Sequence, residues 1–69
     1  MKEVKIRDEF IKLGQAMKLS GAAESGTDAK ERILNGEIRV NGEVCLMRGK
    51  KLYPGDVFTA EGEEYRVIS

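Results

Sequence analysis

The 69-residue sequence contains no histidine and only one cysteine. Without histidine it lacks the most common general base, and no nucleophile stands beside an activating group. The lone Cys45 excludes an intrachain disulfide and, with histidine absent, a Cys/His metal site; we expect a half-buried filler side chain there. The sequence therefore indicates a protein that is not an enzyme and that has no metal or other cofactor.

Long apolar runs are also missing. No stretch approaches the roughly 20 residues of a membrane-spanning helix, and the opening MKEVKIRDEF has no apolar signal-peptide core. A chain this short fits one domain, residues 1–69. We therefore expect a cytoplasmic, monomeric, single-domain protein with no membrane partner.

Aromatic residues are few. Tryptophan is absent, and the only aromatic side chains are Phe10, Tyr53, Phe58 and Tyr65. We expect most of them in the core, which argues against a platform on which single-stranded bases stack.

The net charge is zero, but the charges are unevenly spread along the chain. Residues 39–51 carry four basic side chains against one acid, whereas residues 56–69 carry four acids against one base. Such segregation can make one face of a neutral molecule basic. It also fits an ordinary solvated surface, so composition alone does not choose between the two.

Residues 25–43, SGTDAKERILNGEIRVNGE, form the most strongly patterned stretch. Ser25 precedes Asp28 by three residues, an arrangement in which the serine side chain caps a helix. A glycine then follows the apolar helical face, and apolar and charged residues alternate as in a strand. Asn41-Gly42 is typical of a type I′ hairpin turn. The pattern predicts a helix joined to a β-hairpin.

The rest of the chain predicts more strands and one more helix. Residues 3–8 alternate as in an edge strand, and apolar residues four apart predict a helix from about Leu13 to Leu19. The features expected after the hairpin are a bulge or loop at Arg48-Gly49, a type II turn at Pro54-Gly55, and strands at residues 57–60 and 64–68. The predicted fold class is α+β: two short helices packed on a small antiparallel sheet.

Two places can attract phosphate. The loop around Gly49 is cationic. From composition alone it fits a loop that contacts phosphates and a loop that is merely solvated equally well. The N-terminus of the second helix offers free N–H groups and hydroxyls to an anion, although an ordinary cap explains Ser25 fully. Lys30, one turn further on, is placed to project beside Lys18.

The ordered set LGQAMKLSGAAESGTDAKERILNGEIRVNGE and RGKKLYPGD resembles the RNA-binding domain named after ribosomal small-subunit protein S-four. The resemblance spans about residues 11–56 and is strongest to the small stand-alone bacterial YaaA/YbcJ-like family. It implies the αL motif, in which two helices and the following hairpin present basic and small polar residues to structured RNA. The residues implied to contact RNA are Lys12, Lys18, Ser25, Gly26, Thr27, Lys30, Arg39, Asn41, Gly42, Arg48, Lys50 and Lys51.

The sequence departs from the family pattern in places. Gly14 and Ala16 replace larger residues, which implies looser packing of the first helix. Asp28 and Glu31 make the second helix less basic, which implies weaker binding or dependence on a ribonucleoprotein surface.

The function implied is binding of ribosomal or tRNA-like RNA through phosphate and shape contacts, with a role in ribosome assembly or translation and ribosomal particles as partners. The alternative is a protein-interaction adaptor or carrier-like module. A sulfur-carrier version is disfavoured because the chain ends Val67-Ile68-Ser69 rather than Gly-Gly.

Overall fold

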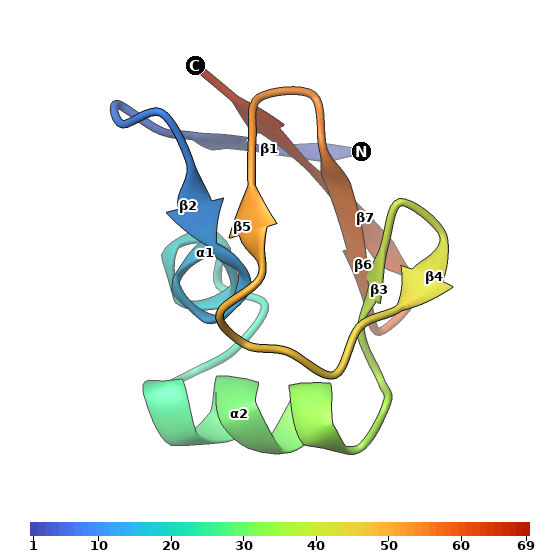
Figure 1. The fold of residues 1–69 in the computed structure, drawn as a ribbon. Coiled ribbons are helices and arrows are strands. Elements are labelled where there is room, and N and C mark those ends of the chain that lie inside the picture. Colours follow the sequence, from blue (N-terminus) through green and yellow to red (C-terminus); the bar gives the residue numbers. More distant parts are fainter.

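The computed structural model describes residues 1–69 and is an α+β fold of two helices and seven short strands (Figure 1). In chain order the elements are β1 (Lys2–Lys5), β2 (Ile11–Lys12), α1 (Leu13–Ser20), α2 (Gly26–Leu34), β3 (Arg39–Val40), β4 (Glu43–Val44), β5 (Lys51–Leu52), β6 (Val57–Ala60) and β7 (Glu63–Ile68).

Five strands form the main sheet in the order β1-β7-β6-β3-β4, and β2 pairs with β5 in a separate two-stranded ladder. Neighbours in the main sheet are antiparallel except β1 and β7, which run parallel with Val4 opposite Val67. The expectation of a purely antiparallel sheet is therefore wrong at this edge. Side-chain alternation fixes which face of a strand is buried, but not which neighbour it pairs with or in which direction.

The two helices pack against each other as predicted. In Figure 1, α1 is seen nearly end-on while α2 lies across the view, so they cross steeply. Leu13, Ala16 and Met17 of α1 and Ala29 and Ile33 of α2 are buried. They belong to one cluster of fifteen buried residues, all apolar or tyrosine, that also takes in the inner face of the sheet.

The local signals in residues 25–43 are confirmed. Ser25 Oγ accepts a hydrogen bond from the backbone N–H of Asp28 at 3.1 Å, so it is the N-cap of α2. Gly36 has φ of 77° and ends the helix in the left-handed region. Asn41 and Gly42 both have positive φ, as the turn between β3 and β4 requires.

The expectation that most aromatic residues are core is only half right. Phe58 and Tyr65 are buried and stacked, with ring centroids 4.9 Å apart. Tyr53 is 43% exposed, and Phe10 is half-buried beside it. Phe10 directly precedes β2 and Tyr53 directly follows β5, so both lie just beyond the Ile11–Leu52 end of the β2–β5 ladder.

Candidate nucleic-acid interface

The cationic loop between β4 and β5 is fixed to the start of α1. The backbone N–H groups of Leu13 and Gly14 donate to the carbonyls of Lys50 and Arg48 at 2.9 and 3.0 Å. Because α1 has no side-chain N-cap, these two carbonyls satisfy N–H groups that would otherwise lack a partner. The loop therefore holds its cations in a defined position over the first turn of the helix.

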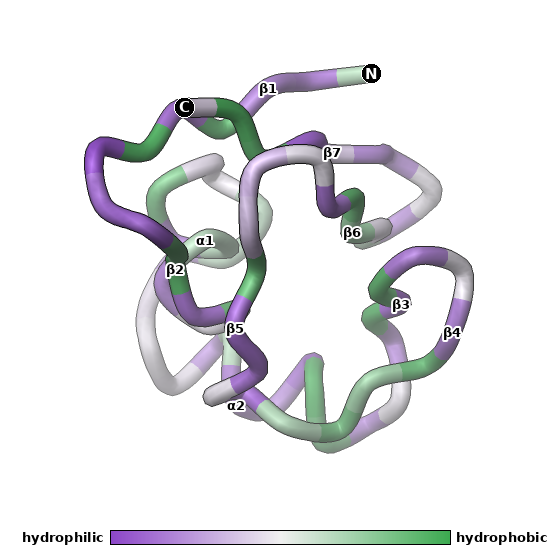
Figure 2. The backbone as a smooth tube through the Cα atoms, turned by 45° about the horizontal axis from the view of Figure 1, so that its top comes forward, coloured by the Kyte–Doolittle hydropathy of each residue, from purple (hydrophilic) through white to green (hydrophobic).

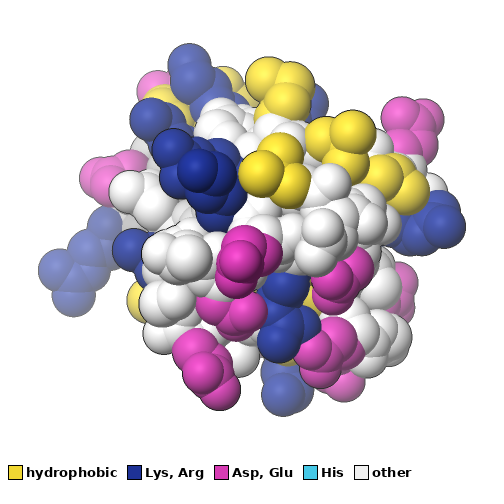
Figure 3. Space-filling view, turned by 90° about the horizontal axis from the view of Figure 1, so that it is seen from below, with side chains coloured by type: hydrophobic (Ala, Val, Ile, Leu, Met, Phe, Trp, Pro, Cys, Tyr) yellow, Lys and Arg dark blue, Asp and Glu magenta, His cyan; other side chains and the backbone are white.

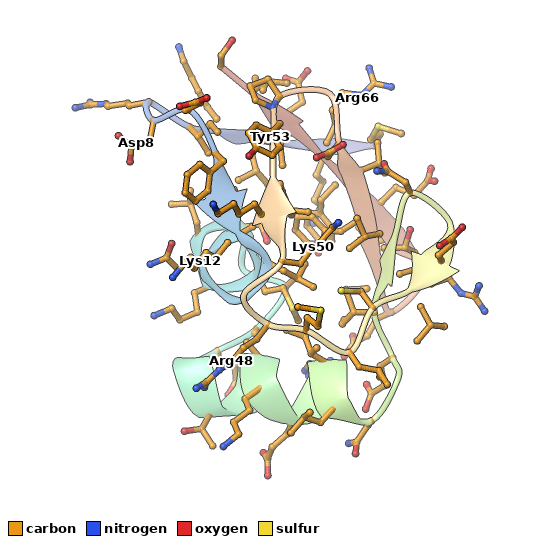
Figure 4. All side chains as sticks on the ribbon, viewed as in Figure 1. Asp8, Lys12, Arg48, Lys50, Tyr53 and Arg66 are labelled. Atoms are coloured by element: carbon orange, nitrogen blue, oxygen red, sulfur yellow. The ribbon has the colours of Figure 1, made fainter.

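A hollow of about 250 Å³ lies between this loop, α1 and the N-terminal half of α2. Its lining includes four cations and no acid, together with Gln15, Gly14, Gly26 and Gly49. We call it the basic groove, and its cations are Lys12, Lys18, Lys30 and Arg48. Figure 4 shows Arg48 extending towards the N-terminal half of α2. Lys18 and Lys30 line the same hollow, in agreement with the prediction that Lys30 projects beside Lys18.

None of the four groove cations has an acidic partner. Of the twelve Lys and Arg side chains, only Arg32 lies within ion-pair distance of a carboxylate. Four like charges around one small hollow repel one another, and an anion placed among them relieves that repulsion. The groove is therefore electrostatically suited to a phosphate.

The N-terminus of α2 opens onto the same groove. Gly26 lines it, and the free N–H groups of the first helical turn add positive potential. The side chain of Ser25 is already engaged as the cap. Thr27 is exposed on the first turn but does not line the groove.

The opposite side of α2 is acidic. Asp28, Glu31, Glu37 and Glu61 surround Arg32 there, and its guanidinium pairs with Asp28 at 3.1 Å and also with Glu61. A hydrogen bond from the Glu24 N–H and the nearby guanidinium hold the pKa of Asp28 below its usual value. The hydrogen bonds that the Arg32 guanidinium donates to the carboxylates of Glu61 and Asp28 raise the pKa of Arg32.

Figure 3 views the molecule from the side of α2 and shows this division directly. Lys and Arg gather beside a hydrophobic area towards one edge of the face, while Asp and Glu spread over the rest. Asp28 and Glu31 of α2 line the hollow around Arg32, and neither lines the basic groove.

The hairpin residues Arg39, Asn41 and Gly42 lie outside the basic groove and hold the hairpin together. Arg39 donates to the carbonyl of Gly42 at 3.2 Å. The Asn41 side chain accepts from Val57 N–H at 3.0 Å and donates to Asp56 at 3.2 Å. These bonds fasten the turn to the start of β6.

Lys50 and Lys51 are neighbours in sequence but diverge in space. Lys50 lines a separate hollow beside the β3–β4 hairpin, on the other side of β5 from Arg48 (Figure 4). Lys51 lies directly opposite Lys12 in the β2–β5 pair, and its Nζ is 4.8 Å from the centre of the Phe10 ring. The structure thus brings five of the predicted contact residues together around the basic groove, namely Lys12, Lys18, Gly26, Lys30 and Arg48, and places the others outside its lining.

Sequence reasoning missed an exposed apolar strip next to the groove. Leu34, Val44, Leu46 and Met47 are each about half exposed or more, and Figure 2 shows the chain after β4 as hydrophobic until just before β5. The signal was the unalternating run VCLM, which interrupts the strand pattern immediately before RGKK. Cys45, within this run, is half-buried against the core as expected.

No cluster of His, Cys, Asp and Glu in the structure has the arrangement of a metal site. Neither helix has the length and apolar character needed to cross a membrane.

Comparison with known proteins identifies relatives of the whole fold. A family model described as "S4 domain" matches residues 4–68. The probable ribosome maturation protein RlbA of Bacillus subtilis (strain 168) is 44% identical over 59 residues, which cover 86% of this chain and 83% of that protein. The solution structure of YbcJ from E. coli, described as having an αL motif involved in RNA binding, superposes with a TM-score of 0.76 at 27% identity, covering 100% of this chain and 89% of YbcJ.

Proposed function

The chain belongs to the S4 domain family, and from this membership and the basic groove we propose that it binds structured RNA without catalysing a reaction. The observation that carries the proposal is the set of four cations around one hollow with no acid among them. The description of YbcJ as carrying an RNA-binding motif supports the same function for the shared fold.

Phosphate contacts account for the binding energy in this proposal. Lys12, Lys18, Lys30 and Arg48 project from four different elements or loops towards one hollow, so they match a folded backbone rather than an extended strand. Structured RNA is recognised mainly by shape and by phosphate and 2′-hydroxyl contacts. The rigid attachment of the Arg48 loop to α1 keeps these cations in place before RNA arrives.

The proposed process is ribosome assembly, with ribosomal RNA or a ribosomal particle as the partner. The name of the Bacillus subtilis relative, a probable ribosome maturation protein, supports this process. A ribosomal partner would also place the protein in the cytoplasm. Crosslinking in cells followed by sequencing of the bound RNA identifies the partner, and recovery of ribosomal RNA is the expected result.

The groove is tested by neutralising two of its cations. We expect Lys12→Gln with Arg48→Gln to weaken binding to a ribosomal RNA fragment and to lower the log-salt slope by about 1.4–1.8, that is, 0.7–0.9 for each lost phosphate contact. The matched control is Lys2→Gln with Arg66→Gln, the same loss of charge on exposed strand residues outside the groove; Figure 4 shows Arg66 on the sheet, well apart from Arg48. Equal weakening by both pairs would mean that net charge, and not the groove, governs binding.

One observation favours a second function, that of a protein-binding adaptor. The exposed apolar strip of Leu34, Val44, Leu46 and Met47 adjoins the basic groove, and exposed apolar patches often mark protein contacts. Recovery of a protein partner with no crosslinked RNA from cells would favour this function over RNA binding.

A further inference from the structure

A second and larger hollow lies beside the basic groove. It has a volume of about 700 Å³, within the range of ligand-binding pockets, and lies between α1 and the segment joining β1 to β2. Its apolar lining is made by Ile6, Phe10, Ile11 and Leu19. Leu19 is 62% exposed although it sits on a helix, so the hollow presents apolar surface that the fold leaves uncovered.

The rim of this hollow is mainly cationic. Lys5, Arg7 and Lys18 line it, none of them has a carboxylate partner within ion-pair distance, and Asp8 is its only acid. An apolar surface ringed by cations suits a ligand with a flat apolar face and a phosphate. A nucleotide has both.

The two hollows adjoin each other. Gln15 and Lys18 line both, so this part of α1 forms the ridge between them. A ligand that contacts Lys18 in the basic groove is therefore at the edge of the second hollow.

The Phe10 ring is held in position from outside the hollow. Tyr53 packs against it with centroids 5.9 Å apart, and the Lys51 ammonium lies 4.8 Å from its centre. Neither of these two residues lines the hollow. The ring is thus fixed before any ligand enters, which lowers the entropic cost of stacking on it.

We propose that this hollow receives one unpaired nucleotide of the RNA bound in the basic groove. The proposal rests on the proposed function. The base packs on Phe10 and Leu19, its phosphate is held by Lys18 and Arg7, and Asp8 and Gln15 offer hydrogen-bonding groups to the base edge. Proteins that recognise RNA sequence-specifically commonly bind unstacked bases in loops and bulges and pack them on aromatic side chains.

The test compares three short RNA hairpins: one with a single bulged adenosine, one with an abasic nucleotide at the same bulge, and one fully paired. We expect the first to bind about tenfold more tightly than the second, the size of one base-stacking contact. The abasic RNA keeps the bend and the phosphates, so this difference reports on the base alone.

The variants Leu19→Ser and Phe10→Ala are expected to abolish the difference between bulged and abasic RNA. Leu19 is exposed, so Leu19→Ser should stay folded. It therefore tests the site even if Phe10→Ala, which removes a half-buried ring, unfolds the protein. Leu34→Ser is the matched control, because Leu34 is 59% exposed and lies outside this hollow.

The outcomes separate the two proposals. Equal, salt-dependent binding of bulged and abasic RNA overturns the nucleotide site and leaves the proposed RNA-binding function standing. Loss of the difference in Leu34→Ser as well as in Leu19→Ser also overturns the site. Absence of binding to all three hairpins overturns both proposals.

Discussion

The two sides of α2 carry opposite charges although they belong to one nine-residue helix. Gly26 and Lys30 face the basic groove, where the cations have no acidic partners. Asp28, Glu31 and Arg32 face the other way, where Arg32 is paired with two carboxylates. One side is therefore electrostatically satisfied within the protein, and the other is left for a ligand.

This contrast changes how the acids of α2 are interpreted. From the sequence, Asp28 and Glu31 implied a weaker RNA-binding helix. In the structure neither lines the basic groove, and Asp28 is occupied with the Glu24 N–H and Arg32. Repulsion between charges on opposite sides of the helix is screened by solvent, so their effect on a phosphate in the groove is small.

Reversing charge on the groove side should produce the largest effect. We expect Lys18→Glu with Lys30→Glu to weaken RNA binding about a hundredfold, because each lost contact to a charged group is worth about 1.5 kcal/mol. Fluorescence anisotropy at fixed salt measures the change. The converse variant on the acidic side, Glu31→Lys, should alter affinity by less than about threefold, since a solvent-exposed charge away from the contact is largely screened. A large gain of affinity in Glu31→Lys would remove the distinction between the two sides.

Loss of the helix cap should lower the stability of the fold without changing the charged side chains on either side of α2. Ser25→Ala removes the hydrogen bond to the Asp28 N–H and should cost about 1 kcal/mol. Thermal unfolding should show a melting temperature lower by roughly 4–8 °C for a domain of this size. Thr27→Ala is the control, because Thr27 lies on the same turn and makes no side-chain hydrogen bond. Weaker RNA binding by folded Ser25→Ala would instead support the direct phosphate contact implied by the family resemblance.

Features that depend on a few adjacent residues could be predicted from the sequence. The Ser25 cap and the Asn41-Gly42 turn use bonds or backbone angles within four residues, so the local pattern contains the needed information. The parallel pairing of β1 with β7 joins the two ends of the chain. No local pattern encodes such pairing.

The candidate site shows the same limit. Arg48 and Lys50 were expected to contact RNA as parts of one cationic loop, yet Arg48 lines the basic groove and Lys50 lines the hollow beside the β3–β4 hairpin. The carbonyls of both residues accept hydrogen bonds from the start of α1, a long-range contact that the local sequence does not reveal. The meeting of Lys18 with Lys30 was predictable because helix periodicity and a short connection fix both directions.

The acidic side should respond to pH. The folded-state pKa of Asp28 is below its unfolded value of about 3.9, so the stabilisation from this group is complete at neutral pH. It is lost as the pH falls below about 4 and Asp28 becomes protonated in the folded state. Between about pH 6 and about pH 3, we expect the melting temperature of the wild type to fall more than the melting temperature of Asp28→Asn. An identical fall in both proteins would show that the contacts of ionised Asp28 do not stabilise the fold.

Gly14, which lines the basic groove, allows a test of how deeply bound RNA enters the groove. A Cβ added at Gly14 would lie 3.5 Å from the Arg48 carbonyl oxygen and 3.6 Å from its Cβ, which are ordinary contacts. Gly14→Ala should therefore fit and should raise stability by about 0.5 kcal/mol, because alanine favours the helix over glycine. If phosphates rest on the cations at the rim, RNA affinity should stay unchanged. A clear loss of affinity in this more stable variant would show that the RNA backbone descends to the floor, where it requires the space that Gly14 leaves.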